Sequence, residues 1–107
     1  MQFQQYDASD LRSTEYRKDP DYPFEFIADV AGDNADLFVM DEEVVDNNEL
    51  GRRMAELGAV TKGVKLDPES CCFYAYFKSG PDGIAFLKKL SAYLSQKAKL
   101  LEKAKAF

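Results

Sequence analysis

The C-terminal stretch constrains the fold more than any other part of the chain, because residues 82–106 have the composition of one long helix. Ala, Leu, Lys and Gln dominate this stretch, and neither Gly nor Pro occurs after Gly83. Apolar residues recur there at helical spacing and form a broad stripe of Ile84, Leu87, Leu90, Tyr93, Leu94, Leu100 and Leu101. At 1.5 Å per residue, this helix is about 35 Å long. We therefore expect its last turns to project, to pair with a second copy or to contact a partner.

Alternating residues predict a hairpin upstream. In 24–30 the even-numbered residues are apolar, and Glu25 and Asp29 lie on the opposite face, which is typical of a half-buried strand. Turn-forming residues at 31–34 and the apolar run 37–40 then predict a second strand that returns beside the first.

A second hairpin is predicted between residues 60–66, which alternate in the same way, and the aromatic run 71–78. The segment 67–69 is also a good helix start, with Asp at the N-cap and Pro in the first turn. We favour the strand interpretation of 71–78, because a short run between turn residues suits a hairpin. If 71–78 is helical instead, the sheet has three strands.

Between the hairpins, the sequence predicts a short helix. Asp46 and Glu49 have the spacing of a capping box, and Gly58 is well placed to end the helix. The apolar stripe of this helix consists of Leu50, Met54 and Leu57.

These elements predict an α+β fold, with a small antiparallel sheet of two hairpins and with the middle and C-terminal helices packed on one face. The 107 residues suit a single domain, residues 1–107, in which 1–21 form an N-terminal arm. The expected core is Phe24, Phe26, Ala28, Val30, Phe38, Leu50, Met54, Leu57, Val64, Phe73, Ala75, Phe77, Leu87, Leu90 and Leu94.

Residue types needed for most catalysis are missing. The chain contains no His, which excludes Ser-His-Asp and Cys-His pairs. Its glycines form neither a phosphate-binding loop nor a dinucleotide fingerprint. We therefore expect no enzyme, no cofactor and no metal. A lesser alternative is a carboxylate- or metal-dependent enzyme that uses Asp29 with Asp36, or the cluster Asp41, Glu42, Glu43 and Asp46.

The sequence favours a cytoplasmic protein. No apolar run approaches the roughly 20 residues that cross a bilayer, and the first residues lack the pattern of a secretory signal. The adjacent Cys71 and Cys72 are poorly placed for an ordinary disulfide, so we expect two free thiols.

Charge suggests how the protein functions. The net charge is −5, and it is unevenly distributed: up to Asp82 acidic residues outnumber basic ones 18 to 8, whereas six Lys and only Glu102 follow. An acidic body disfavours direct nucleic-acid binding. We expect a noncatalytic regulator or inhibitor that docks on a basic protein surface, in the manner of antirestriction or anti-CRISPR proteins. Its predicted contact residues are Asp29, Asp33, Asp36, Asp41, Glu42, Glu43, Asp46 and Glu49.

Two other interpretations concern apolar residues. An oligomeric structural or adaptor protein could assemble as a homodimer through Tyr93, Leu94, Leu100, Leu101 and Phe107. The aromatic residues at 73, 74, 76 and 77 could stack bases, but few basic residues are near them in sequence, and we interpret them as core.

Two short segments resemble known families. Residues 66–70 and the apolar run after them resemble a segment of antirestriction proteins, whereas 54–58 together with 73–77 resemble a segment of the ribonuclease E inhibitors. Each likeness covers a fraction of the chain, and no residue role is transferred from either family.

Overall fold

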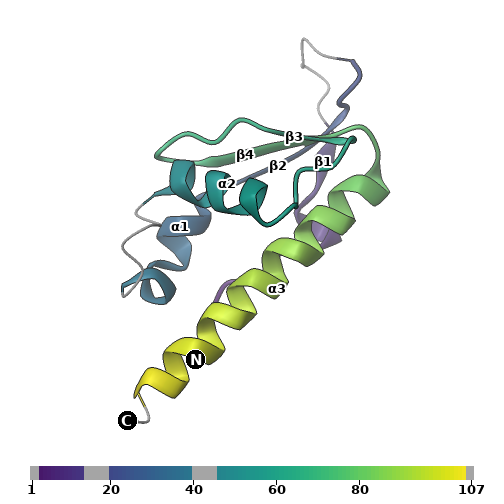
Figure 1. The fold of residues 1–107 in the computed structure, drawn as a ribbon. Helices are drawn as coiled ribbons and strands as arrows, with labels where there is room; N and C mark the ends of the chain where they lie inside the picture. The colour runs from purple at the N-terminus through teal and green to yellow at the C-terminus, as the bar shows by residue number, and fades with distance from the viewer. Residues whose placement is uncertain (1–2, 14–19, 40–45, 106–107) are drawn as a thin grey trace.

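The computed structural model describes residues 3–13, 20–39 and 46–105 (Figure 1). In chain order, its elements are the 3₁₀ helix η1 (Ala8–Asp10), strands β1 (Arg12–Ser13) and β2 (Phe24–Ala28), helix α1 (Val30–Asp33), the 3₁₀ helix η2 (Ala35–Phe38), helix α2 (Asn47–Glu56), strands β3 (Val64–Leu66) and β4 (Phe73–Phe77), and helix α3 (Gly80–Lys105). The predicted α+β class is confirmed, because an antiparallel sheet packs against the long C-terminal helix.

The sheet contains four strands in the order β1-β2-β4-β3. Phe26 of β2 lies opposite Ala75 of β4, and Val64 of β3 lies opposite Phe77 of β4, with both pairings antiparallel. β2 and β3 therefore run in the same direction on either side of β4. Together with the helices that connect them, they form a split β-α-β unit.

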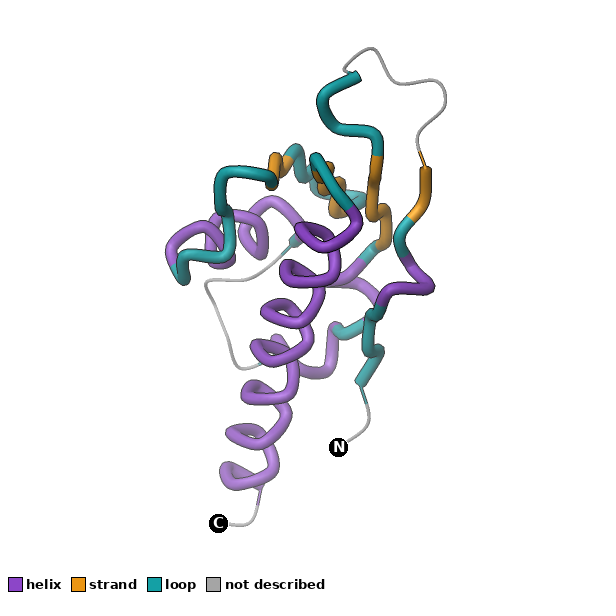
Figure 2. Tube along the Cα trace, turned by 90° about the vertical axis from the view of Figure 1, so that its right-hand side faces the viewer, coloured by secondary structure: helices purple, strands orange, loops and turns teal. Residues whose placement is uncertain are grey.

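All three α-helices lie on one side of this sheet (Figure 1). α3 runs past the end of the strands, as Figure 2 shows, and the molecule measures 50 × 23 × 21 Å along its principal axes. None of the described helices is both long and apolar enough to cross a membrane.

The predicted pairing of 24–30 with 37–40 is wrong. β2 ends before Asp29, whose side chain accepts a hydrogen bond from the Gly32 N–H (3.0 Å) and so begins helix α1 instead of a turn. The 3₁₀ helix η2 follows and packs against α3. β2 pairs instead with β1, which precedes it in the chain. The sheet therefore still contains two antiparallel pairs of consecutive strands, β1 with β2 and β3 with β4.

The segment expected to form an N-terminal arm packs against the fold over residues 3–13. Tyr6 is buried, and its ring meets Phe26 edge-on with the ring centroids 5.1 Å apart. The Ser91 hydroxyl of α3 donates a hydrogen bond to the Tyr6 carbonyl (3.0 Å). These contacts make Tyr6 part of the core.

The strand interpretation of 71–78 is confirmed over Phe73–Phe77. Glu69 and Cys72 exchange backbone hydrogen bonds of 2.8 and 3.2 Å, so the ambiguous segment before β4 forms a tight hairpin turn and not a helix start. The odd-numbered residues of β4 are fully buried, whereas Tyr74 and Tyr76 lie on the opposite face.

The predicted middle helix is confirmed as α2. Asp46 accepts a hydrogen bond from the Glu49 N–H (3.1 Å), and Gly58 follows the helix with a φ of 75°, a conformation that favours glycine. Leu57 is not a core residue, since it is 58% exposed. Helical geometry ends at Glu56, and the spacing that placed Leu57 on the apolar stripe no longer applies.

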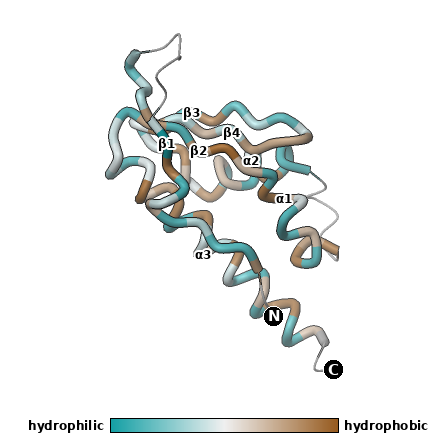
Figure 3. The backbone as a smooth tube through the Cα atoms, turned by 180° about the vertical axis from the view of Figure 1, so that it is seen from behind, coloured by the Kyte–Doolittle hydropathy of each residue, from teal (hydrophilic) through white to brown (hydrophobic). Residues whose placement is uncertain are grey.

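Ser79 caps α3. Its hydroxyl accepts a hydrogen bond from the Asp82 N–H (3.2 Å) and donates one to the Asp82 carboxylate (2.8 Å). Hydrophobic and hydrophilic stretches alternate along α3 (Figure 3). Its buried residues are Phe86, Leu87, Leu90, Leu94, Ala98 and Leu101. Ile84 and Leu100 of the predicted stripe are exposed instead.

The core lies between the helices and the sheet. The Phe86 ring of α3 contacts the rings of Phe73 and Phe77, at centroid distances of 6.0 and 5.6 Å. Apart from Leu57, the predicted core side chains are buried or packed against the core. Buried apolar side chains that the sequence did not predict are Tyr6, Leu37, Ala59, Phe86, Ala98 and Leu101.

Gly51 allows α2 to lie close to the turn before β4. A Cβ atom at Gly51 would lie 2.6 Å from Pro68 Cγ, much closer than van der Waals contact. Although Ala is a better helix former by about 1 kcal/mol, overpacking costs more, and we predict that Gly51→Ala lowers the free energy of unfolding by about 1–2 kcal/mol. Urea unfolding measures this change. A stabilised Gly51→Ala variant would contradict the close packing.

Candidate functional site

Five of the predicted acidic contact residues lie at one end of the molecule, where β2 ends and α2 begins. They are Asp29, Asp33, Asp36, Asp46 and Glu49. Asp41, Glu42 and Glu43 lie outside the described residues. We call the described five the acidic end.

Buried Asn47 connects the elements of the acidic end. Its Nδ2 donates hydrogen bonds to Asp29 Oδ1 (2.9 Å) and to the Ser70 carbonyl (3.2 Å), and its Oδ1 accepts one from the Ala31 N–H (2.9 Å). One side chain therefore joins the start of α2 to the start of α1 and to the β3–β4 turn. Because Asn47 is fully buried, its amide depends on these partners for its hydrogen bonds.

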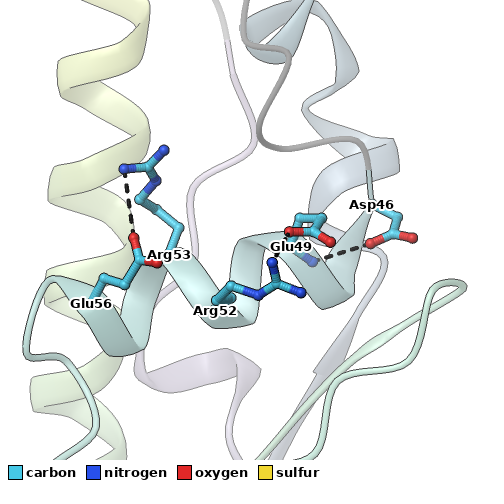
Figure 4. Close-up of polar contacts among 5 residues, drawn as sticks. All are labelled: Asp46, Glu49, Arg52, Arg53 and Glu56. Atoms are coloured by element: carbon cyan, nitrogen blue, oxygen red, sulfur yellow. Dashed lines mark hydrogen bonds and ion pairs between the residues drawn. The ribbon is translucent and has the colours of Figure 1, made fainter.

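Three of the five carboxylates have structural partners. Asp29 caps α1 and accepts from Asn47, whereas Asp46 caps α2. The Glu49 carboxylate lies 3.2 Å from Arg52 Nη1, an exposed ion pair that Figure 4 shows beside the Asp46 cap. These three residues stabilise the local structure, and a helix N-cap contributes about 1 kcal/mol to the free energy of unfolding.

Asp33 and Asp36 are different. Both are exposed, and no side-chain hydrogen bond or ion pair joins either carboxylate to another described residue. They line a hollow of about 150 Å³ together with Phe3, Gly32, Asn34, Ala35 and Leu37. Two acidic residues thus line one small polar depression.

Asn34 supports this hollow from within. It is 3% exposed; its Oδ1 accepts a hydrogen bond from the Gln4 N–H (2.7 Å), and its Nδ2 donates to the Val30 carbonyl (2.9 Å) and to the Tyr6 hydroxyl (3.3 Å). Sequence reasoning treated Asn34 as a turn residue. The only signal for its role is its amide side chain, which can both donate and accept.

Nearby titratable groups experience negative charge. Burial is the main reason that the pKa of Tyr6 lies well above its ordinary value of 10.0, and Asp33 raises it further. Desolvation and the neighbouring Cys71 raise the pKa of the Cys72 thiol, and Asp29 adds to this shift. Both cysteines are free, and Cys71 is exposed.

The residues predicted to mediate self-association do not form one exposed surface. Leu94 and Leu101 are buried within the chain, and the partly buried Tyr93 ring stacks on Phe38 with a centroid distance of 6.5 Å. Leu100 is exposed, and Phe107 lies outside the described residues. Among the described members of this set, only Leu100 is therefore an exposed apolar side chain.

The aromatic residues of β4 divide between two faces. Phe73 and Phe77 are core residues, as predicted, but Tyr74 and Tyr76 lie on the face that no described helix covers. Sequence reasoning missed this surface because it treated the four rings as one group. The alternation of Phe and Tyr was the signal, since a buried Tyr needs a partner for its hydroxyl.

In the described ranges, no group of three or more Cys, Asp or Glu side chains is arranged to hold a metal ion. A second hollow, of about 380 Å³, lies between residues 5–8 and α3. It is mainly apolar, with Lys88 and Asp7 among its lining residues.

Asn47→Ala should lower the free energy of unfolding by about 2–3 kcal/mol, because it leaves buried polar groups without partners. The neighbouring Asn48 is exposed, and Asn48→Ala should change the stability by less than about 0.5 kcal/mol. Urea unfolding of both variants is the test. Equal small losses would contradict the role of Asn47.

Stability should fall as the pH rises through 10.0, because an unfolded Tyr6 ionises near its ordinary pKa whereas the folded one stays protonated. The stabilising contribution is complete below that pH and is lost above it. Tyr6→Phe should make the fall shallower in urea unfolding measured between pH 9 and about 12. An unchanged slope would show that Tyr6 does not contribute.

Compared with models of protein families, with curated proteins and with solved structures, the chain matches none. The functional inference therefore depends on the geometry and charge of the chain itself.

Proposed function

We propose that this chain is a noncatalytic regulator or inhibitor that binds a basic surface of a partner protein through its acidic end. The hollow between Asp33 and Asp36 is the observation that supports this most. Its volume of about 150 Å³ equals that of about five water molecules in the liquid, which is enough for an ammonium or guanidinium group. A partner's Lys or Arg side chain would be bound between two carboxylates.

The charge around the hollow supports the same proposal. Asp29, Asp46 and Glu49 lie on adjoining elements, and a field of one sign increases the rate at which an oppositely charged partner arrives. Basic surfaces of this kind occur on nucleic-acid-processing and defence enzymes, whose channels bind phosphates through Lys and Arg. An inhibitor of this kind would occupy such a channel.

The lack of His supports a noncatalytic role, since His is the commonest general base. Asp29 and Asp46 cap helices, and their carboxylates are therefore engaged with backbone N–H groups. This structural role also supports a noncatalytic protein, because it leaves fewer carboxylates that could act on a substrate.

The test is affinity capture from a host lysate at low and high salt, followed by measurement of the identified partner's affinity for the purified chain. We predict a partner that salt releases, and binding that weakens at least about tenfold in the double variant Asp33→Asn and Asp36→Asn, since a charge pair in a protected site contributes about 1.5 kcal/mol or more.

The control removes two exposed charges elsewhere, with Glu56→Gln and Asp67→Asn. This variant has the same net charge as the test variant, and it should retain affinity within about threefold. Equal losses in the two variants would mean that only the net charge matters. A partner indifferent to salt and to both variants would contradict the proposal.

A further inference from the structure

The face of the sheet opposite the helices presents a row of side chains across all four strands. Arg12 of β1 lies opposite Glu25 of β2, which lies opposite Tyr76 of β4, which lies opposite Lys65 of β3. Paired residues of neighbouring strands project from the same face. No described helix covers this face, which we call the open sheet face (Figure 1).

Tyr74 lies next to Tyr76 on the open sheet face, opposite Ile27. Two residues along a strand correspond to about 6.8 Å, so the two tyrosine side chains project side by side. β4 is a central strand, and both of its neighbours are in place. The pair is therefore held on a rigid element, not on a loop.

Cations surround a third ring at the Tyr76 end of this face. The Nζ atoms of Lys65 and Lys78 lie 5.8 and 5.7 Å from the centroid of the Tyr22 ring. Arg12 is exposed at the β1 edge. Although the whole chain carries a net charge of −5, the row of paired residues holds Arg12 and Lys65 and one carboxylate, that of Glu25, and Lys78 adds a third cation near Tyr22.

We infer that the open sheet face binds single-stranded nucleic acid. Tyr74 and Tyr76 are partly exposed. Aromatic rings on a sheet surface can stack unpaired bases, and neighbouring Lys and Arg side chains can bind the phosphates between them. Tyr74 and Tyr76 would stack two bases, and Lys65 and Lys78 would contact the backbone. Cys72 and desolvation raise the pKa of the Tyr74 hydroxyl, and the nearby Glu69 raises it further. Because the negative charge of Glu69 would repel phosphates, we place the phosphates toward the Tyr76 end.

This inference does not depend on the proposed function, because the two use different surfaces. The expectation that the chain does not bind nucleic acid came from its total charge, which does not describe this face. An acidic peptide would use the lysines but leave the flat rings of Tyr74 and Tyr76 without a role. A duplex would hide its base faces.

The test is fluorescence anisotropy with labelled oligonucleotides of about ten bases, namely a uridine run in RNA, a thymidine run in DNA and a hairpin duplex, at low salt. We expect the single strands to bind and the duplex to bind at least about tenfold more weakly. Either RNA or DNA binding supports the inference, and their ratio identifies which is preferred. Equal binding of the duplex, or no binding of any oligonucleotide, would overturn it.

Variants separate stacking from charge. Tyr74→Leu with Tyr76→Leu keeps apolar bulk on the strand and should weaken binding about tenfold or more, whereas Tyr74→Phe should bind as the native chain does. Lys65→Gln with Lys78→Gln should reduce the slope of log affinity against log salt by about 1.4. Circular dichroism confirms that each variant is folded.

The matched control is Lys89→Gln with Lys99→Gln, two exposed lysines of α3. It removes the same charge and should change affinity by no more than about twofold. A loss as large as that of the Lys65 and Lys78 variant would mean that total charge, and not this face, governs binding. A glutamate peptide that competes as well as the oligonucleotide would likewise overturn the inference.

Discussion

The hydrogen bonds of Asn47 are the interaction on which the arrangement of this fold depends. They join the first residues of α1 and α2 to the β3–β4 turn, and they do so inside the protein, where an unpaired amide is costly. Because Asp29 is both the cap of α1 and a partner of Asn47, the helix that replaces the expected turn is fixed to α2. The position of Asp33 and Asp36 follows from this connection.

The consequence is a molecule with two distinct polar surfaces. At one end, α1 and η2 present Asp33 and Asp36 beside a small hollow. On the open sheet face, the cations of Lys65 and Lys78 surround an aromatic ring. Our two proposals assign a basic protein to the first surface and an anionic polymer to the second. Regulation of a nucleic-acid enzyme is a role that would use both surfaces.

Sequence reasoning succeeded where one local signal dominated. The cap at Asp46 and the composition of α3 predicted those helices, period-two alternation predicted β2 and β3, and a short aromatic run between turn residues predicted β4. It failed where the partner was distant in sequence. Nothing near Tyr6 indicates that it packs on Phe26, and the capping chemistry of Asp29 is also turn chemistry.

The sequence shows which acidic residues are close together in the chain, but it does not show which of their side chains have structural partners. Five acidic residues that are close in sequence also lie together at one end of the molecule. The sequence could not separate those that cap helices, such as Asp29, from those that remain exposed, such as Asp33. That distinction arises from tertiary packing around Asn47 and Asn34, two polar residues that the sequence alone places in turns or on surfaces.

The most direct measurement is a titration of the isotope-labelled protein with an arginine-rich peptide, followed by amide chemical shifts in NMR spectra. We predict saturable shifts centred on Gly32 to Leu37, with the largest shifts at the residues that line the hollow and with one common midpoint. Shifts spread evenly over all acidic residues, or centred on Asp67 and Glu69 at the β3–β4 turn, would contradict this prediction, because they would show that the peptide responds to net charge and not to the hollow between Asp33 and Asp36.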